Sequence, residues 1–476
     1  MQVFIYLAYL IAAVFFIYGI KGMTTPKTAV RGNQLSAVGM LIAVVAALLD
    51  HNVVHYYYII MGVLIGASIG TFLAKKIQMT SMPEMVAALN GFGGGASLMV
   101  AVANYLEMQT AYGSGNAELI AMMPALDMKW SIAVILSILI GAVTLMGSFV
   151  AVGKLMGKLG DPSSIGMFKM IVKVCLALLV AGSIYFVSTN PLEQADLLIL
   201  MIVICLLLGV ALVIPIGGAD MPVVIALLNS YSGLAGSATG FVLGNNGLII
   251  TGSLVGASGL ILTTIMCKAM NRSLTNVLFG GSMAAQAGIS KDENDAFYEG
   301  KVKVTSADEV AMLLDSAKKV VFVPGYGLAV AQAQHATREL ANILQGRGSE
   351  VKYAIHPVAG RMPGHMNVLL AEAEVPYEQL IEMDTINPEF AQTDVAIVLG
   401  ANDVTNPAAS SDPNSPIFGM PILEVQNAKT VIVVKRGLSP GFAGIPNALF
   451  INDNSLMVHG DAKLVLQEIT SAMKDL

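Results

Sequence analysis

The sequence predicts a membrane-spanning bundle of about nine α-helices, followed by a C-terminal α/β domain with a parallel, doubly wound sheet. First, 55% of the 476 residues are hydrophobic and the mean hydropathy is +0.71, which is far more apolar than soluble proteins of this size. Second, charged residues are unevenly distributed. Residues 1–272 contain 12 Lys and Arg residues and 9 Asp and Glu residues, whereas the shorter stretch 273–476 contains 14 Lys and Arg residues and 23 Asp and Glu residues. We therefore expect a membrane domain at 1–272, a linker at 273–300 and a soluble domain at 301–476.

About nine apolar stretches in the first part are long enough to cross a bilayer. The first lacks the basic start and the cleavage site of a signal peptide, so we expect it to be retained. Cys175, Cys205 and Cys267 lie in these stretches, and we expect buried thiols there. The predicted spans are 3–20, 35–49, 53–74, 84–106, 131–153, 168–187, 195–215, 221–242 and 247–267.

Basic residues gather in the loops on one side of the membrane if every stretch crosses it. These residues are Lys21, Lys27, Arg31, Lys75, Lys76, Lys154, Lys158, Lys169, Lys268 and Arg272. The opposite loops contain Asp50, Glu107, Glu118, Asp127, Glu193 and Asp196, with Lys129 as their basic residue. The bias of Lys and Arg toward the cytoplasm therefore predicts an outside N-terminus and a cytoplasmic C-terminal domain.

Polar side chains within the apolar stretches indicate a path for protons. Asn90 lies in the fourth stretch, and Asn229 and Ser232 lie in the eighth, while Glu84 and Asp220 stand near the cytoplasmic ends of the two. Polar groups in hydrocarbon are costly and often mark ion or proton paths. The alternatives are a helix–helix hydrogen bond for each asparagine and a helix N-cap for Asp220.

The soluble part alternates strand and helix patterns, which predicts a Rossmann-like sheet with its ligand at the carboxyl ends of the strands. The expected strands are 319–323, 351–356, 394–399, 430–434 and 449–452. The expected helices are 305–318, 328–334, 367–374 and 461–473. Between the first strand and the helix at 328–334, Gly325, Tyr326 and Gly327 form the tight turn of a dinucleotide site, with Val330 in place of the third glycine.

The strand ends favour NADP(H) over NAD(H). An NAD site usually has an acid at the end of the second strand, but here that strand ends in Ala354-Ile355-His356-Pro357. A later strand ends in Lys435 and Arg436, and paired cations suit the 2′-phosphate of NADP(H). The alternative is a solvated basic pair. The sequence pI of about 5.6 argues against a nucleic-acid partner.

Four long motifs resemble the β subunit of proton-translocating NAD(P)+ transhydrogenase, and the resemblance covers nearly the whole chain. They occupy residues 218–224, 323–334, 355–373 and 400–403. The resemblance implies that NADP(H) binds to this chain and NAD(H) to a partner α subunit, in an α2β2 assembly in the bacterial inner membrane. It also implies reversible hydride transfer between the two nucleotides coupled to proton translocation. We expect no metal site.

The family's NADP(H) contacts can be carried over onto matching positions, with Asp403 and Arg361 as the catalytic candidates. Asp403 ends a strand at the crevice, where an acid beside a polyanion is unfavourable unless it has a role; the alternative is a helix cap. Together with the glycine turn, the expected contacts are Gly325, Tyr326, Gly327, Val330, Val358, Ala359, Gly360, Arg361, Met362, Pro363, Gly400, Ala401, Asn402, Asp403, Val404, Gly419, Met420, Lys435, Arg436, Gly437, Gly441, Phe442, Gly460 and Asp461.

One position departs from the family's pattern. Many relatives have a histidine where this chain has Asn90, and asparagine does not titrate near neutral pH. The titrating group is then a water cluster, a carboxylate such as Glu84 or Asp220, or a histidine of the α subunit. A different class, a channel or transporter with a nucleotide-sensing domain, is the rival function; it would not need a 2′-phosphate site.

Overall fold

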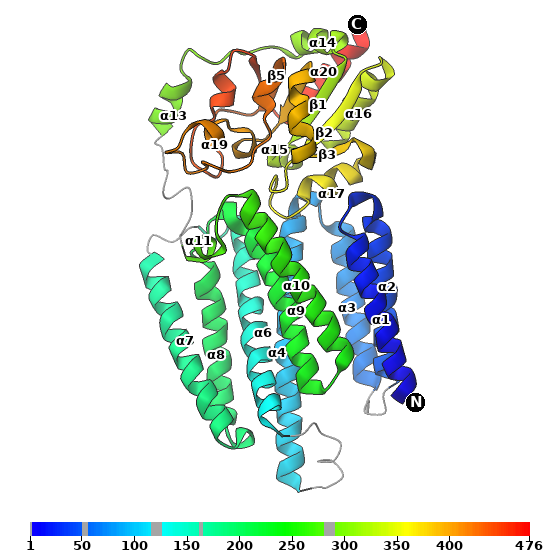
Figure 1. Cartoon of the computed structure of the whole chain (residues 1–476), viewed down its shortest axis with the longest axis vertical. Helices are drawn as coiled ribbons and strands as arrows, with labels where there is room; N and C mark the ends of the chain where they lie inside the picture. Colours follow the sequence, from blue (N-terminus) through cyan, green and yellow to red (C-terminus); the bar gives the residue numbers. More distant parts are fainter. Residues whose placement is uncertain (1, 50–55, 116–125, 161–164, 280–290) are drawn as a thin grey trace. The chain divides into compact units, whose positions relative to one another are not determined.

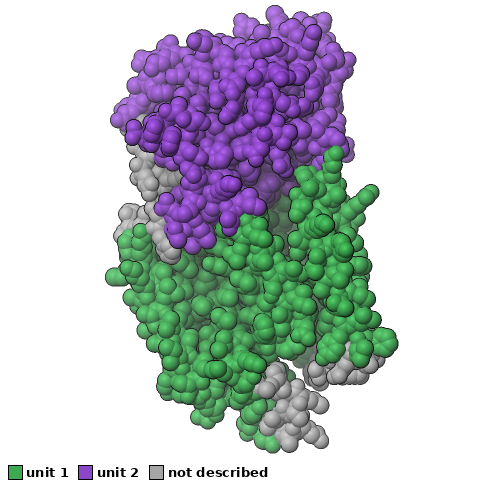
Figure 2. Space-filling model, viewed as in Figure 1, with its two compact units in different colours: residues 1–215, 224–263 green, residues 216–223, 264–476 purple. Residues whose placement is uncertain are grey.

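The computed structural model describes residues 2–49, 56–115, 126–160, 165–279 and 291–476 (Figure 1). The loops that contain Asp50 and Glu118, and the middle of the predicted linker at 280–290, lie outside these residues. The chain divides into two compact units, which Figure 2 distinguishes by colour. The first unit comprises Met1–Pro215 and Val224–Thr263, and the second comprises Ile216–Val223 and Thr264–Leu476.

Within the described residues, nine helices are long and apolar enough to cross a membrane, as the hydropathy predicted. The chain is therefore a multi-pass membrane protein. The second helix begins at Pro26, well before the predicted start at residue 35, because proline is well suited to the first turn of a helix. The helices are α1 (Gln2–Gly22), α2 (Pro26–Leu48), α3 (Tyr56–Lys76), α4 (Met82–Ser114), α6 (Met128–Leu155), α7 (Ile165–Ser188), α8 (Ala195–Val213), α9 (Met221–Leu243) and α10 (Asn246–Ala269).

Glycines let neighbouring helices of the first unit approach closely. A Cβ on Gly94 of α4 would lie 2.7 Å from the carbonyl oxygen of Gly141 on α6. A Cβ on Gly233 of α9 would lie 2.5 Å from the backbone nitrogen of Gly256 on α10. Contacts this short exclude any side chain, so small residues at these crossings fix the helix–helix packing.

The α/β part contains a six-stranded parallel sheet in the order β3-β2-β1-β4-β5-β6, which is the Rossmann order. Alternate residues of β1, β4 and β5 enter one core cluster with Phe390 and Phe450, which covers one face of the sheet. The residues between them are buried as well, so both faces of these three strands are covered. The order reverses between β1 and β4, and a ligand crevice is expected there. The strands are β1 (Lys319–Pro324), β2 (Glu350–Ile355), β3 (Leu380–Glu382), β4 (Val395–Leu399), β5 (Thr430–Lys435) and β6 (Ser455–His459).

Helices α14 (Ala307–Ser316), α16 (Gln334–Gly346), α17 (His365–Glu372) and α20 (Ala462–Asp475) accompany the sheet (Figure 1). A capping box begins α14: the Ser306 side chain accepts from the Glu309 N–H while the Glu309 carboxylate accepts from the Ser306 N–H. The predicted linker also contains two short helices, α11 (Leu274–Phe279) and α13 (Lys291–Tyr298).

Two expectations for the α/β part were wrong in detail. The strand expected at 449–452 is the 3-10 helix η8 (Ala448–Ile451), because the side chain of Asn447 accepts the Leu449 N–H and bends the chain. The last strand is β6 instead. The helix expected at 328–334 is α15 (Tyr326–Val330), and the chain then breaks at Gln332, whose φ is 48°, before α16 begins.

Candidate functional site

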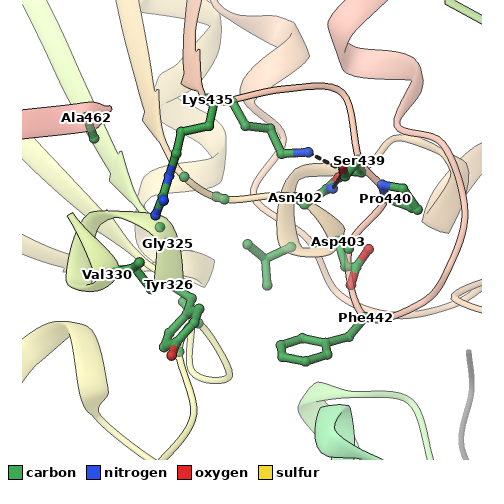
Figure 3. A pocket seen from close by; sticks show the side chains of 18 of the residues that line it. Gly325, Tyr326, Val330, Asn402, Asp403, Lys435, Ser439, Pro440, Phe442 and Ala462 are labelled. Carbon is green, nitrogen blue, oxygen red and sulfur yellow. Dashed lines mark hydrogen bonds between the residues drawn. The ribbon is translucent and has the colours of Figure 1, made fainter. Parts of the chain in front are cut away.

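The carboxyl ends of β1, β4 and β5 surround a cavity of about 520 Å³. In Figure 3, Tyr326 and Val330 lie on one side of this cavity, and Asp403 and Phe442 lie on the other. The lining residues that the sequence predicted are Gly325, Tyr326, Gly327, Val330, Val358, Ala359, Gly360, Gly400, Ala401, Asn402, Asp403, Val404, Met420, Lys435, Arg436, Gly437, Gly441, Phe442 and Gly460. The cavity therefore lies where the strand order reverses.

The glycine turn after β1 lies against the end of β4. A Cβ on Gly325 would be 2.4 Å from the Cα of Ala401, and one on Gly327 would be 2.6 Å from the Cα of Gly400. Gly400 has a φ of 61°, a conformation that glycine adopts without strain. The Gly327 N–H donates to the Gly400 carbonyl at 2.9 Å. These glycines bring two backbones together at the floor of the cavity, which a side chain would prevent.

Asp403 links the end of β4 to the loop after β5, residues 436–443, which we call the β5 loop. Its carboxylate accepts the N–H of Ala443 at 3.1 Å. Burial raises the pKa of Asp403, and the N–H groups of Ala443 and Phe442 oppose that shift. A Cβ on Gly441 would lie 2.4 Å from an Asp403 oxygen, so glycine is required at that point of the loop.

Lys435 and Arg436 supply positive charge at the end of β5. The Lys435 ammonium donates to the Ser439 carbonyl, as drawn in Figure 3, and lies 5.3 Å from the centre of the Phe450 ring. Burial lowers the pKa of Lys435 to about 8, although the nearby Asp403 carboxylate opposes the shift. Arg436 is exposed. A cavity with two cations, close glycine backbones and apolar side chains fits an anionic ligand that also has apolar parts.

The segment after β2 is held by a buried histidine. His356 accepts the N–H of Val358 at 3.2 Å with Nδ1, and its Nε2 lies 2.9 Å from the carbonyl oxygen of Pro421. Burial lowers the pKa of His356 to about 4, so the ring is neutral near pH 7 and its Nε2–H donates to that carbonyl. This neutral ring fixes the backbone of residues 358–360 at the cavity wall.

Five predicted contact residues do not line the cavity: Arg361, Met362, Pro363, Gly419 and Asp461. The guanidinium of Arg361 stacks over the Tyr326 ring at 4.3 Å from its centre, so it packs against a lining residue. Asp461 caps α20 by accepting the Lys463 N–H at 3.1 Å. Ser439 and Pro440 also line the cavity, within the segment 435–442 onto which the family's contacts carry over. Lining residues that were not predicted include Val434 and Ala462.

The predicted proton-path residues of the first unit lie on facing helices. The amide of Asn90 on α4 donates to the Ile225 carbonyl of α9 at 3.3 Å. A Cβ on Gly93 would lie 2.4 Å from the hydroxyl oxygen of Ser232, so α4 and α9 also touch there. Asn229 is half-buried on α9, and one carboxylate oxygen of Glu84 is fully buried in the first turn of α4. Polar groups thus gather along the α4–α9 contact.

Asp220, in the short helix η3 (Gly218–Asp220), is held by Arg272 within the second unit. One guanidinium nitrogen of Arg272 donates to the two carboxylate oxygens at 2.9 and 2.7 Å. The Asp220 side chain is 0% exposed, so the pair is shielded from solvent. From the sequence, Arg272 was an orientation signal only, and its pairing with Asp220 was not predicted.

Comparison with known proteins agrees with this architecture. The family model described as "NAD(P) transhydrogenase beta subunit" matches residues 5–472. A relative from Rhodospirillum rubrum, named "NAD(P) transhydrogenase subunit beta", is 48% identical over 467 residues, which are 98% of each chain. A second relative with the same name, from one strain of that organism, has the same identity and coverage. The similarity therefore includes both the membrane helices and the α/β part.

Proposed function

Because the chain belongs to the family of NAD(P) transhydrogenase beta subunits, we propose that it binds NADP(H) and couples hydride exchange with NAD(H) to proton movement. A beta subunit takes part in an oxidoreductase complex with an alpha subunit. We assign NADP(H) to this chain and NAD(H) to that alpha subunit, in an α2β2 assembly. We further assign the complex to the bacterial inner membrane, with the N-terminus outside and the α/β part in the cytoplasm, because basic residues favour that side.

The assignment of NADP(H) rests on the two adjacent cations Lys435 and Arg436, which both line the cavity. A guanidinium binds a phosphate with two parallel hydrogen bonds, and an ammonium adds a point charge. The end of β2 offers the neutral His356 instead of the acid that would hold a ribose 2′-hydroxyl. Both features favour a nucleotide with a 2′-phosphate over one without it.

The residues at the cavity contribute mainly position and electrostatics. Bound NADP(H) supplies the hydride chemistry, which requires the two nicotinamide rings within about 3–3.5 Å of each other. The glycine turn permits close approach of the backbone to a pyrophosphate, and Val330 and Phe442 offer apolar surface that excludes water. The charge of Asp403 beside Lys435 keeps the β5 loop in place. We keep Asp403 and Arg361 as the residues whose loss should impair turnover most.

The membrane part would supply the driving force. One proton that crosses about 200 mV releases about 4.6 kcal/mol, which shifts a product ratio on the order of a thousandfold. We place its path between α4 and α9, past Asn90, Asn229 and Ser232, with Glu84 and Asp220 at its cytoplasmic end. Coupling requires that protonation of the path alters the affinity for NADP(H), and by linkage NADP(H) alters the proton affinity equally.

The decisive experiment is to purify the chain with its alpha subunit and to measure reduction of an NAD analogue by NADPH in sealed vesicles. The proposal expects turnover together with a pH change across the membrane. A complex that binds NADPH but does not reduce the analogue would instead support the rival function, a channel or transporter with a nucleotide-sensing domain.

A further inference from the structure

Helix α13 (Lys291–Tyr298) is part of the segment that joins the membrane spans to the sheet, and it packs on the α/β core with one face. Tyr298 is 3% exposed and Asn294 is 4% exposed, whereas Asp292 and Asp295 face solvent. The Tyr298 ring stacks on Phe450 with centroids 6.1 Å apart and an angle of 26° between the planes. The ammonium of Lys435 also lies over the Phe450 ring. The joining segment therefore packs against the same ring as Lys435.

Asn294 contacts the β5 loop directly. Its side-chain amide donates to the backbone carbonyl of Leu438 at 3.2 Å. Leu438 lies between Gly437 and Ser439, and both of these neighbours line the cavity. A buried hydrogen bond to the loop backbone at this point restricts the loop where it passes the proposed nucleotide.

Tyr298 reaches a second lining residue, Asn402, through one intermediate residue. The backbone N–H of Asn447 donates to the Tyr298 hydroxyl at 2.6 Å. The side-chain amide of Asn447 in turn donates to the backbone carbonyl of Asn402 at 3.0 Å, and Asn402 lines the cavity. Asn447 is fully buried, so loss of one partner would leave a polar group unsatisfied in the core.

We propose that Asn294 and Tyr298 are positioning residues through which the segment joining the two parts of the chain sets the rate of NADP(H) release. They hold the β5 loop and Asn402, which meet at the cavity, where the Asn402 side-chain amide lies 3.3 Å from the carbonyl oxygen of Ser439. Both belong to a single helix outside the sheet. A displacement of α13 would break both connections together and loosen the loop. This inference rests on the proposed binding of NADP(H) in the cavity.

The test measures NADPH dissociation from the full chain in complex with its alpha subunit, by stopped-flow fluorescence. Asn294→Ala should accelerate dissociation by about three- to tenfold, the equivalent of one lost hydrogen bond, and should leave the association rate unchanged. Asn294→Asp keeps the shape but removes the donor at pH 7, so it should accelerate dissociation as well. Tyr298→Phe should act in the same direction. Asp295→Ala, on the exposed face of the same helix, is the matched control and should release NADPH at the wild-type rate.

A purely structural role would lower the melting temperature and the amount of folded complex, but the folded fraction would release NADPH at the wild-type rate. That result for Asn294→Asp and Tyr298→Phe would overturn the inference, even if Asn294→Ala fails to fold. Failure of the proposed function looks different, because the wild-type complex would then not bind NADPH at all. A third outcome would discard the positioning role alone. In it, the wild type binds NADPH, Lys435→Ala does not, and every α13 variant releases NADPH at the wild-type rate.

Discussion

The Asp403 carboxylate accepts the backbone N–H of Ala443 at 3.1 Å and so ties the end of β4 to the β5 loop. Asp403→Asn keeps an acceptor oxygen for this bond but removes the charge beside Lys435. We expect the variant to melt within a few degrees of the wild type and to lose turnover by about tenfold or more, since charge positioned at a reacting site is worth several kcal/mol. Thermal melting and NADPH-dependent reduction of an NAD analogue check this. Normal proton-coupled turnover by the folded variant would assign Asp403 a structural role.

NADPH affinity should depend on pH through Lys435, whose pKa burial lowers to about 8 in the ligand-free protein. A bound 2′-phosphate favours the charged ammonium and raises that pKa, so above pH 8 binding must take up a proton. Affinity should be constant near pH 7 and should fall by up to about tenfold per pH unit above pH 8.

Isothermal titration of the full chain between pH 7 and 9.5 measures this dependence. Lys435→Arg is the matched variant, because a guanidinium stays charged over the whole range. Its affinity should be flat with pH. An equally steep fall in that variant would show that another group titrates.

Replacement of Asn229 by Leu should slow proton-coupled turnover, while NADP(H) binding to the isolated α/β part, which lacks Asn229, stays unchanged. Asparagine can order water along the α4–α9 contact, whereas leucine cannot. Asn90→His should be tolerated, because the resemblance to the family implies a histidine at that position. Proton uptake by sealed vesicles gives the measurement. If Asn229→Leu pumps at the wild-type rate, the path does not pass Asn229, and its amide serves helix packing only.

We also expect the α/β part to fold as a separate fragment, and its N-terminal boundary should matter. A fragment that begins at Lys291 retains α13, whereas one that begins at Glu299 loses the buried ring of Tyr298. Loss of that burial costs about 2 kcal/mol, which corresponds to a melting temperature lower by roughly 4–8 °C. Calorimetry of the two fragments tests this. Equal melting temperatures would mean that α13 does not stabilise the core.

Elements with strong local signals could be predicted from the sequence. The spans follow from hydropathy, and β1, β4 and β5 are buried apolar runs between Gly, Pro or charged residues. The edge strands β3 and β6 were missed, because β3 has three partly exposed residues and β6 contains Ser455 and His459 at its ends. Residues 449–452 look apolar enough for a strand, but the Asn447 side chain turns them into a 3-10 helix.

The same distinction applies to the cavity. The sequence predicted Gly325, Gly327, Lys435 and Arg436 as lining residues. Each lies at or just after the carboxyl end of an apolar strand, and such strands are easy to recognise in the sequence. Ala462 was missed because only the packing of α20 against the sheet brings it there. The burial of Asn294 had no signal at all, since the sequence of α13 is mostly polar and its contact partner lies 144 residues away.

The central claim is that the cavity at the ends of β1, β4 and β5 binds NADP(H) through Lys435 and Arg436. The most direct measurement is titration of the full chain with NADPH and with NADH, for the wild type and for the double replacement of Lys435 and Arg436 by Ala. We predict that the wild type binds NADPH far more tightly than NADH. The double variant should lose several kcal/mol toward NADPH, about a hundredfold or more in affinity, and should change little toward NADH. Equal wild-type affinities for NADPH and NADH would contradict the claim.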